Sequence, residues 1–360
     1  MQHFSIDPRN VQPPTRDLPS TAKVAPRLPD AKEVKGHPAK AGGEENASIY
    51  FVGTATTILE WEGIRLMTDP NFLHAGDHVH LGPGVSSTRR TNPAVDLHEL
   101  PRIDLVLLSH YHAYVFSTPS GRIKLMNTPY SDHFDQKVEQ SLRRDLPIIS
   151  TPHAKSALTS KPHGEAFSQV FGVETYQQMM VNVKSDDAER QPRMRMTAMP
   201  GKHVPTNKVV EKLNEFAAAV PPTNGWMLEL GYGNSSMKTD FNCGYRVYIS
   251  GDTLMVDELK EIPQRYAGLN IDLMLVHLGG TTIPTPALLP MALMVTMDGR
   301  QGVELMQTVR PEVTIPIHYD DYEVFASPLE DFRRLVEQAG LSDRVVYLDR
   351  SDLFRFRVQP

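Results

Sequence analysis

Hydrophobic and polar positions along the chain predict a mixed α/β protein. Residues 47–53, 54–61 and 64–69 form short β-type runs separated by glycine-containing turns. Residues 105–109 are all apolar or small, which is typical of a strand covered on both faces. Beyond them helical and strand patterns alternate, so we expect an α/β protein in which sheets are flanked by helices.

Further elements are expected in regular alternation up to the C-terminus. Strands are expected at residues 147–151, 167–183, 193–199, 225–230, 245–250, 271–276 and 313–318, with a short pair within 345–358. Helices are expected at residues 133–144, 153–158, 254–266, from 297 to just before Pro311, and at 329–338.

Residues 1–46 differ from the rest of the chain. They are polar, punctuated by prolines, and show neither a period of two nor one of 3.6. We expect an extended or disordered N-terminal arm, either loose or draped over the domain. Residues 47–360 are long enough to bury a large core, and 40% of the whole chain is hydrophobic, which favours one large domain over two small ones.

Composition narrows the classes of partner. The net charge is −6 and lysine and arginine do not cluster, which argues against nucleic acid. One cysteine, Cys243, excludes an internal disulfide and suits a reducing compartment. No stretch reads as a signal peptide or a membrane span, so we expect a cytoplasmic protein. The oligomeric state stays open.

Candidate chemistry begins at the end of the buried strand. His110 and His112 are two residues apart and therefore point to the same side of an extended chain. Two imidazoles in this arrangement form half a metal site. The alternative is a pair of strand-edge histidines satisfied by hydrogen bonds alone, and the spacing does not decide between them.

Asp132-His133 changes this balance. If residues 114–131 are removed from the sequence, residues 109–113 and 132–133 read Ser-His-Tyr-His-Ala-Asp-His, which has the His-x-His-x-Asp-His pattern. In this motif the chain resembles the metallo-β-lactamase superfamily, although Tyr114 and Val115 stand where the family has Asp and His. The interruption is 18 residues, or 54 nucleotides. We interpret it as a retained intron or a late insertion. The alternative is a surface loop whose ends stay close.

The resemblance covers about residue 47 to the end and implies an αββα sandwich. Thr68-Asp69-Pro70 is similar to the branch with N-acyl-phosphatidylethanolamine phospholipase D and the ascorbate-phosphate lactonases. His277-Leu-Gly-Gly and Ile-Pro-Ile-His318 resemble a fungal branch. Asp69 either orients a ligand histidine or caps the turn before Pro70.

The resemblance also implies a full ligand set. Histidines at the ends of two later strands, His203 and His318, match family ligands, and Asp252 in Gly-Asp-Thr matches the carboxylate that bridges two metals. Asp252 has a second interpretation as the N-cap of the following helix. The implied sites are His110, His112 and His203 for one zinc, and Asp132, His133 and His318 for the other, with Asp252 between them.

This donor set suits two Zn²⁺ ions per chain, with iron or manganese as alternatives. Paired ions of this kind supply a hydroxide nucleophile at neutral pH and polarise the bond under attack. Asp132 corresponds to the catalytic group that orients this nucleophile. The expected reaction is hydrolysis of a small molecule, and the resemblance points to lactam or lactone ring opening, for example of a benzoxazolinone-type xenobiotic.

Three further histidines are candidates for the substrate pocket. His78 and His80 lie in the long segment 72–93, which is expected to be a loop, and line a pocket or simply face solvent. His277 follows a buried strand and either contacts substrate or is a satisfied rim histidine. An apolar helix candidate at residues 213–220 is expected to cover the site.

Two other functions compete with the zinc hydrolase. Splitting the ligand motif would leave a one-metal or metal-free homologue that is catalytically impaired. A phosphodiesterase of the phospholipase D type would need an apolar entrance for lipid. Only residues 290–297 offer one, and a core or rim helix explains them as well.

Overall fold

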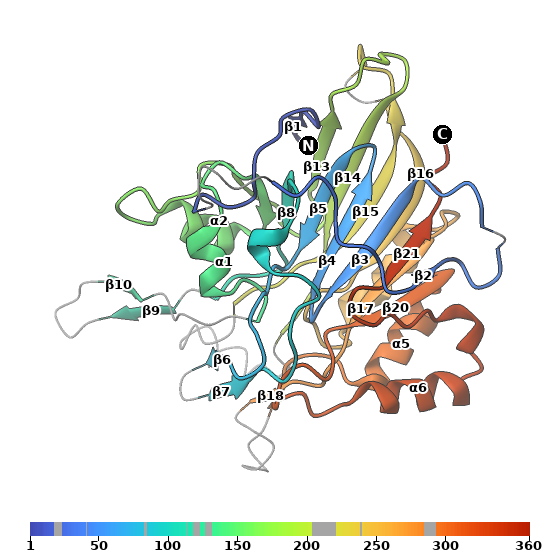
Figure 1. Ribbon diagram of the computed structural model, residues 1–360. Helices are drawn as coiled ribbons and strands as arrows, with labels where there is room; N and C mark the ends of the chain where they lie inside the picture. Colours follow the sequence, from blue (N-terminus) through green and yellow to red (C-terminus); the bar gives the residue numbers. More distant parts are fainter. Residues whose placement is uncertain are drawn as a thin grey trace.

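Two β-sheets lie face to face with helices on their outer sides (Figure 1). The computed structural model describes residues 1–17, 24–40, 42–82, 85–112, 114–117, 123–126, 132–203, 221–237, 240–283 and 293–360. The αββα sandwich expected from the sequence is therefore confirmed.

The first sheet has eight strands within the described residues, in the order β12-β11-β8-β5-β4-β3-β21-β2. At its centre β5 and β8 run parallel, with Leu66 opposite Leu105. The strands are β2 (Val34–Lys35), β3 (Ala47–Gly53), β4 (Thr56–Trp61), β5 (Ile64–Thr68), β8 (Leu105–Leu107), β11 (Ile148–Ser150), β12 (Val170–Gly172) and β21 (Leu353–Phe356).

The second sheet has seven strands in the described part of the chain, in the order β1-β13-β14-β15-β16-β17-β20. Successive strands from β13 through β14 and β15 to β16 pair antiparallel. From β16 onward the pairing is parallel, first with β17 and then with β20. The strands are β1 (Gln2–Ile6), β13 (Gln178–Val183), β14 (Gln191–Met199), β15 (Gly225–Gly233), β16 (Asn242–Ile249), β17 (Leu273–His277) and β20 (Val313–Ile317).

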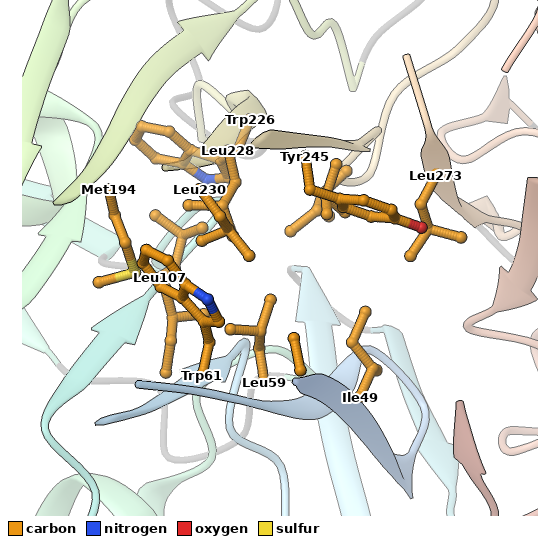
Figure 2. Packing of buried hydrophobic residues seen from close by; sticks show 14 of the residues in the cluster. Ile49, Leu59, Trp61, Leu107, Met194, Trp226, Leu228, Leu230, Tyr245 and Leu273 are labelled. Carbon is orange, nitrogen blue, oxygen red and sulfur yellow. The ribbon is translucent and has the colours of Figure 1, made fainter. Parts of the chain in front are cut away.

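Apolar side chains from both sheets meet in the space between them. Figure 2 shows Leu59 and Leu107 of the first sheet facing Leu228 and Leu230 of the second. All four are at most 3% exposed. Alternate residues of each strand face this layer, so removing their apolar surface from water stabilises the pairing of the sheets.

The helices cover the outer faces through separate apolar clusters. Helices α1 (Gln136–Ser141) and α2 (Pro152–Thr159) contribute Val138 and Leu158 to a cluster on the first sheet. Helices α5 (Gly299–Val309) and α6 (Leu329–Gln338) contribute Leu305 and Phe332 to a cluster on the second. The short α4 (Ile262–Arg265) belongs to the same second layer.

The N-terminal arm contributes one strand to each sheet. β1 pairs in parallel with β13, and β2 pairs in parallel with β21. Between them Arg16 donates to Glu165 and Asp17 contacts His98. These contacts attach the arm to the domain at several points.

Two hairpins lie outside the two main sheets, below helices α1 and α2 in Figure 1. β6 (His78–Gly82) pairs with β7 (Val85–Thr88), within a segment expected to be a loop. β9 (Tyr114–Ser117) pairs with β10 (Ile123–Met126) inside the suspected insertion, and this hairpin extends away from the sandwich (Figure 1). A third short pair joins β18 (Thr282–Ile283) to β19 (Leu293–Met294).

Several expected boundaries are corrected by the structure. The strand expected at 167–183 is two strands, because the chain reverses around Tyr176, where φ is positive. The helix expected at 254–266 is a 3₁₀ turn, Asp257–Glu261, followed by α4, because Pro263 lacks the N–H that a continuous helix needs. The helix expected at 133–144 is shortened to α1.

Other expectations have different outcomes. The pair of strands expected within 345–358 is a single strand, β21. The helix candidate at 213–220 lies outside the described residues, as do residues 290–292. The described remainder of 290–297 does not form the expected core or rim helix, because Leu293–Met294 is the strand β19, paired with β18. Short 3₁₀ turns occur at Leu97–Glu99 and Ser342–Arg344. In the described part of the chain, the helices are too short or too polar to cross a membrane.

Candidate metal centre

One edge of the sandwich collects the candidate ligands, because strands that run in the same direction end together. β5 and β8 are parallel in one sheet, and β16, β17 and β20 are parallel in the other. Just past these ends come His110 and His112 after β8, Asp252 after β16 and His318 after β20. His203 follows β14, which runs in the same direction as β16 through two antiparallel pairings.

Three histidines form the first cluster. His110, His112 and His203 each offer a ring nitrogen, and these atoms all lie within 4.8 Å of one another. The Nε2 atoms of His110 and His112 are 3.1 Å apart. All three side chains are buried. Three imidazoles converging on one point are the donor set of a zinc site.

The second cluster adds carboxylates. Candidate ligand atoms of Asp132, His133, Asp252 and His318 lie within 4.8 Å of one another. His133 Nε2 lies 3.1 Å from His318 Nε2 and 3.1 Å from Asp252 Oδ2. His318 Nε2 lies 3.5 Å from Asp132 Oδ2. The two clusters together contain all seven residues that the sequence indicated as metal ligands.

Hydrogen bonds at Nδ1 set the orientation of the rings. His203 Nδ1 lies 2.6 Å from the carbonyl of Val295, and His318 Nδ1 lies 3.0 Å from the carbonyl of Leu278. A carbonyl only accepts, so each Nδ1 carries the hydrogen and each Nε2 keeps its lone pair. Metal-binding histidines show this same arrangement, and these residues therefore fit a bound cation.

Electrostatics of the second cluster favour positive charge. Burial lowers the pKa of His133, but the carboxylates of Asp252, Asp132 and Asp69 outweigh it and hold that pKa well above its ordinary value. Burial raises the pKa of Asp132, yet His133 and His318 bring it down to about 2. The carboxylates that favour a proton on His133 equally favour a divalent cation at its Nε2.

In the first cluster the pKa values of the histidines are lowered instead of raised. Burial and the neighbouring His133 hold the pKa of His110 well below its ordinary value. Burial lowers the pKa of His112 to about 4 and also lowers the pKa of His203. These imidazoles are therefore neutral at physiological pH, which is the form that binds metal.

Asp252 lies between the clusters. Its Oδ2 faces His133 and accepts from Thr296 Oγ1 at 3.1 Å, while its Oδ1 accepts from His277 Nδ1 at 3.0 Å. The alternative role as a helix N-cap is not seen, because Val256 precedes the 3₁₀ turn that follows. Both oxygens are thus fixed by neighbours, and Asp252 itself is 1% exposed.

Asp69 contacts the centre indirectly. Its Oδ1 accepts from the backbone N–H and the hydroxyl of Ser109, at 2.8 Å and 2.9 Å. The same oxygen lies 3.5 Å from His133 Nδ1. Of the two interpretations that the sequence allowed for Asp69, these contacts favour the one in which it orients a ligand histidine.

Two of the three histidines expected in the substrate pocket have described side chains, and these lie in different environments. His78 is exposed on the β6–β7 hairpin, with its Nδ1 3.3 Å from Thr88 Oγ1. The side chain of His80 lies outside what the structure describes. His277 is fully buried and holds Asp252, so the structure gives it a positioning contact, while a contact with substrate stays a prediction.

Sequence reasoning missed three polar side chains around the centre. Ser109 directly precedes the first ligand, and its place beside His-x-His is a sequence signal that could have indicated this role. Asn71 and Thr296 carry no such signal, because their partners are 61 and 44 residues away in the chain.

Comparison with known proteins agrees with this geometry. Residues 65–319 match the model of the beta-lactamase superfamily domain. A UPF0173 metal-dependent hydrolase of Archaeoglobus fulgidus is 25% identical over 86% of this chain and 98% of its own. One of Methanopyrus kandleri is 23% identical over 85% of this chain and 98% of its own.

Solved structures show the same fold. An isothiocyanate hydrolase from Delia radicum gut bacteria superimposes with a TM-score of 0.60, at 14% identity over 86% of this chain and 99% of its own. Because the family model matches residues 65–319, the chain belongs to the metallo-β-lactamase superfamily, and the relatives named above are metal-dependent hydrolases.

Proposed function

We propose that this protein is a two-zinc hydrolase that opens the ring of a small lactam or lactone. The observation that carries the proposal is the convergence of seven buried imidazoles and carboxylates into two adjacent clusters. Nitrogen and oxygen donors of this kind suit zinc. When bound, the two ions polarise the scissile bond and provide a nucleophile from water at neutral pH.

The division of ligands follows the clusters. His110, His112 and His203 would hold one ion, and Asp132, His133 and His318 the other, with the carboxylate of Asp252 shared between them. Asp252 suits a shared role because its Oδ2 already faces His133 while its Oδ1 is held by His277.

Asp132 is the proposed catalytic residue. Because its pKa is about 2, its carboxylate is ionised at neutral pH and can only accept hydrogen bonds. It would therefore accept a hydrogen bond from the attacking water and orient the oxygen of that water toward the substrate carbonyl. The group would not deliver a proton to the leaving atom, since it remains ionised.

The burial of the Arg89 guanidinium favours a carbonyl substrate over a phosphodiester. This guanidinium is 1% exposed and donates to Thr91 O, Thr54 Oγ1 and Tyr322 OH. Its Nη2 has no hydrogen-bond partner among the described residues, but burial keeps the guanidinium inside the protein, where it does not meet a phosphate from solvent. A cytoplasmic location, zinc as the metal and the relation to a fungal lactam-opening branch belong to the same proposal.

Substrate turnover tests the proposal. Zinc-loaded protein would be assayed on 2-benzoxazolinone, γ-butyrolactone, bis(4-nitrophenyl) phosphate and phenyl isothiocyanate, the last because a structural neighbour is an isothiocyanate hydrolase. We expect ring opening of the lactam or lactone, with turnover falling at least about a hundredfold in Asp132→Asn.

Each other outcome contradicts part of the proposal. Turnover of the phosphodiester alone would replace it with a phospholipase D type of activity. Turnover of the isothiocyanate alone would overturn the assignment to lactams and lactones. Zinc-loaded protein without activity on any of the four would support the catalytically impaired homologue.

A further inference from the structure

The second cluster depends on residues that return from a long excursion. Asp132 and His133 follow His112 only after residues 113–131, yet their ligand atoms lie in the same buried centre. A connection of this length does not by itself place its far end, because a longer connection leaves the chain more conformational freedom. Contacts outside the connection must therefore position Asp132.

Asn71 supplies the most direct of these contacts. Its side-chain Nδ2 donates to the backbone carbonyl of Asp132 at 2.8 Å, and the residue is 0% exposed. Nδ2 also donates to the hydroxyl of Tyr322 at 2.7 Å. The Oδ1 atom accepts from the N–H of Leu73 at 3.2 Å and from Arg89 at 3.3 Å. All four hydrogen-bonding positions of this amide are used, so its orientation is fixed.

The partners of Asn71 tie it to the body of the fold. Arg89 donates to Tyr322 OH at 3.2 Å, and its guanidinium lies 5.1 Å from the centre of the Tyr322 ring. The backbone N–H of Asn71 donates to Thr56 Oγ1 at 2.9 Å, on strand β4. The amide that holds Asp132 is thus supported by the first sheet and by the segment after His318.

A second contact fixes the other side of His133. The carboxylate of Asp135 accepts from the N–H of Phe72 at 2.6 Å and from the N–H of Val138 at 2.9 Å, where it caps helix α1. Residues 71 and 72 therefore hold residues 132 and 135, with the ligand His133 between these two points.

We propose that Asn71 is a positioning residue for the second metal half-site, and that it replaces the short tether on which the uninterrupted motif would rely. With residues 114–131 present, the Asn71 amide places Asp132. With those residues deleted, one residue joins His112 to Asp132, and this connection alone keeps the ligand near its place. The inference rests on the proposed two-metal function.

A comparison of two chain lengths tests it. Asn71→Ala would be made in the full chain and in a chain lacking residues 114–131. Zinc per chain would be measured by elemental analysis. The affinity of the second half-site, which contains Asp132 and His133, would be measured by competition with a chelator. In the full chain we expect that affinity to fall about tenfold to a hundredfold. In the shortened chain we expect a change of at most about threefold.

Two variants separate positioning from folding. Asn46→Ala removes another hydrogen-bonded asparagine, whose Nδ2 donates to the carbonyl of Val358 at 3.2 Å, and should leave zinc binding unchanged in both lengths. Asn71→Leu keeps the branched shape of the side chain while removing the amide, and should behave as Asn71→Ala. Thermal unfolding of every variant reports whether the fold persists.

The outcomes distinguish this inference from the proposed function. Two zinc ions in the full wild-type chain, with unchanged affinity in Asn71→Ala, would overturn the inference alone. An equal loss in both chain lengths would also overturn it, because Asn71 would then act independently of the tether. A full wild-type chain that binds fewer than two ions would contradict the proposed function and the inference together.

Discussion

Ser109 Oγ lies 3.3 Å from His133 Nδ1, although the two residues are 24 positions apart in the chain. The same oxygen lies 2.9 Å from His110 Nδ1 and 2.9 Å from Asp69 Oδ1. A hydroxyl donates one hydrogen bond and accepts two. Ser109 therefore donates to Asp69 and accepts from both imidazoles, so that the Nε2 atom of each ring is the one that faces its cluster. One side chain thus orients a ligand of each cluster.

Replacing this hydroxyl should weaken both metal sites at once. In Ser109→Ala, His110 and His133 lose the acceptor that fixes their rings, and we expect each zinc affinity to fall about tenfold to a hundredfold. Chelator competition, followed by elemental analysis, measures both affinities.

Conservative and matched variants complete that test. Ser109→Thr keeps the hydroxyl and should restore most of the affinity. Ser150→Ala removes a hydroxyl that is equally buried, at the end of β11, and should change neither site. If Ser109→Ala weakens one site only, the shared role of Ser109 is wrong.

Ligand substitutions should remove ions separately. His112→Ala affects the first cluster and His318→Ala the second, so each variant is expected to retain about one zinc per chain, because the other cluster keeps its donors. Elemental analysis after dialysis gives the counts. His153→Ala, in helix α2, is the control and should retain two. Loss of both ions in each ligand variant would contradict two separable half-sites.

The layer between the sheets should carry much of the stability. Leu228 is 0% exposed in that layer (Figure 2), and Leu228→Ala should lower the free energy of unfolding by about 2–5 kcal/mol. Leu269 is 49% exposed, and Leu269→Ala should change it by less than about 0.5 kcal/mol. Urea titration measures both changes. Equal effects would contradict the placement of the core.

Cys243 should resist thiol reagents in the native protein. Burial and the carboxylate of Glu229 raise the pKa of this thiol to about 12. At pH 8 only roughly one molecule in ten thousand then carries the reactive thiolate, and this fraction rises as the pH approaches 12. Reaction with iodoacetamide should be slow at pH 8 in folded protein and fast after unfolding in guanidinium. A fast reaction in the folded protein would contradict the burial and raised pKa of the Cys243 thiol.

The sequence predicted those features that local pattern determines. The amphipathic run 329–338 with Gly340 beyond it gave helix α6 with its observed bounds. Continuous apolar residues before His110 and before His318 gave β8 and β20, and hence the edge where ligands gather. The continuous helix expected at 254–266 does not form, because Pro263 lacks the backbone N–H that such a helix would use there.

The supports of the centre could not be predicted in this way. Asn71 holds Asp132 and His277 holds Asp252 across 61 and 25 residues, and these contacts arise only once the sheets pair. The interrupted His-x-His-x-Asp-His motif could not be interpreted from the sequence for the same reason. Residue order alone cannot say that Asp132 returns to the centre, because this depends on tertiary hydrogen bonds from residues 71 and 72.

Metal content per chain is the most direct test of the whole account. Elemental analysis for zinc, iron and manganese would be made on the full chain and on the chain lacking residues 114–131, both purified without chelator and dialysed against metal-free buffer. The account predicts two ions per chain in both, with zinc as the metal. Two ions in the shortened chain but one or none in the full chain would contradict it, because the interruption would then break the second half-site.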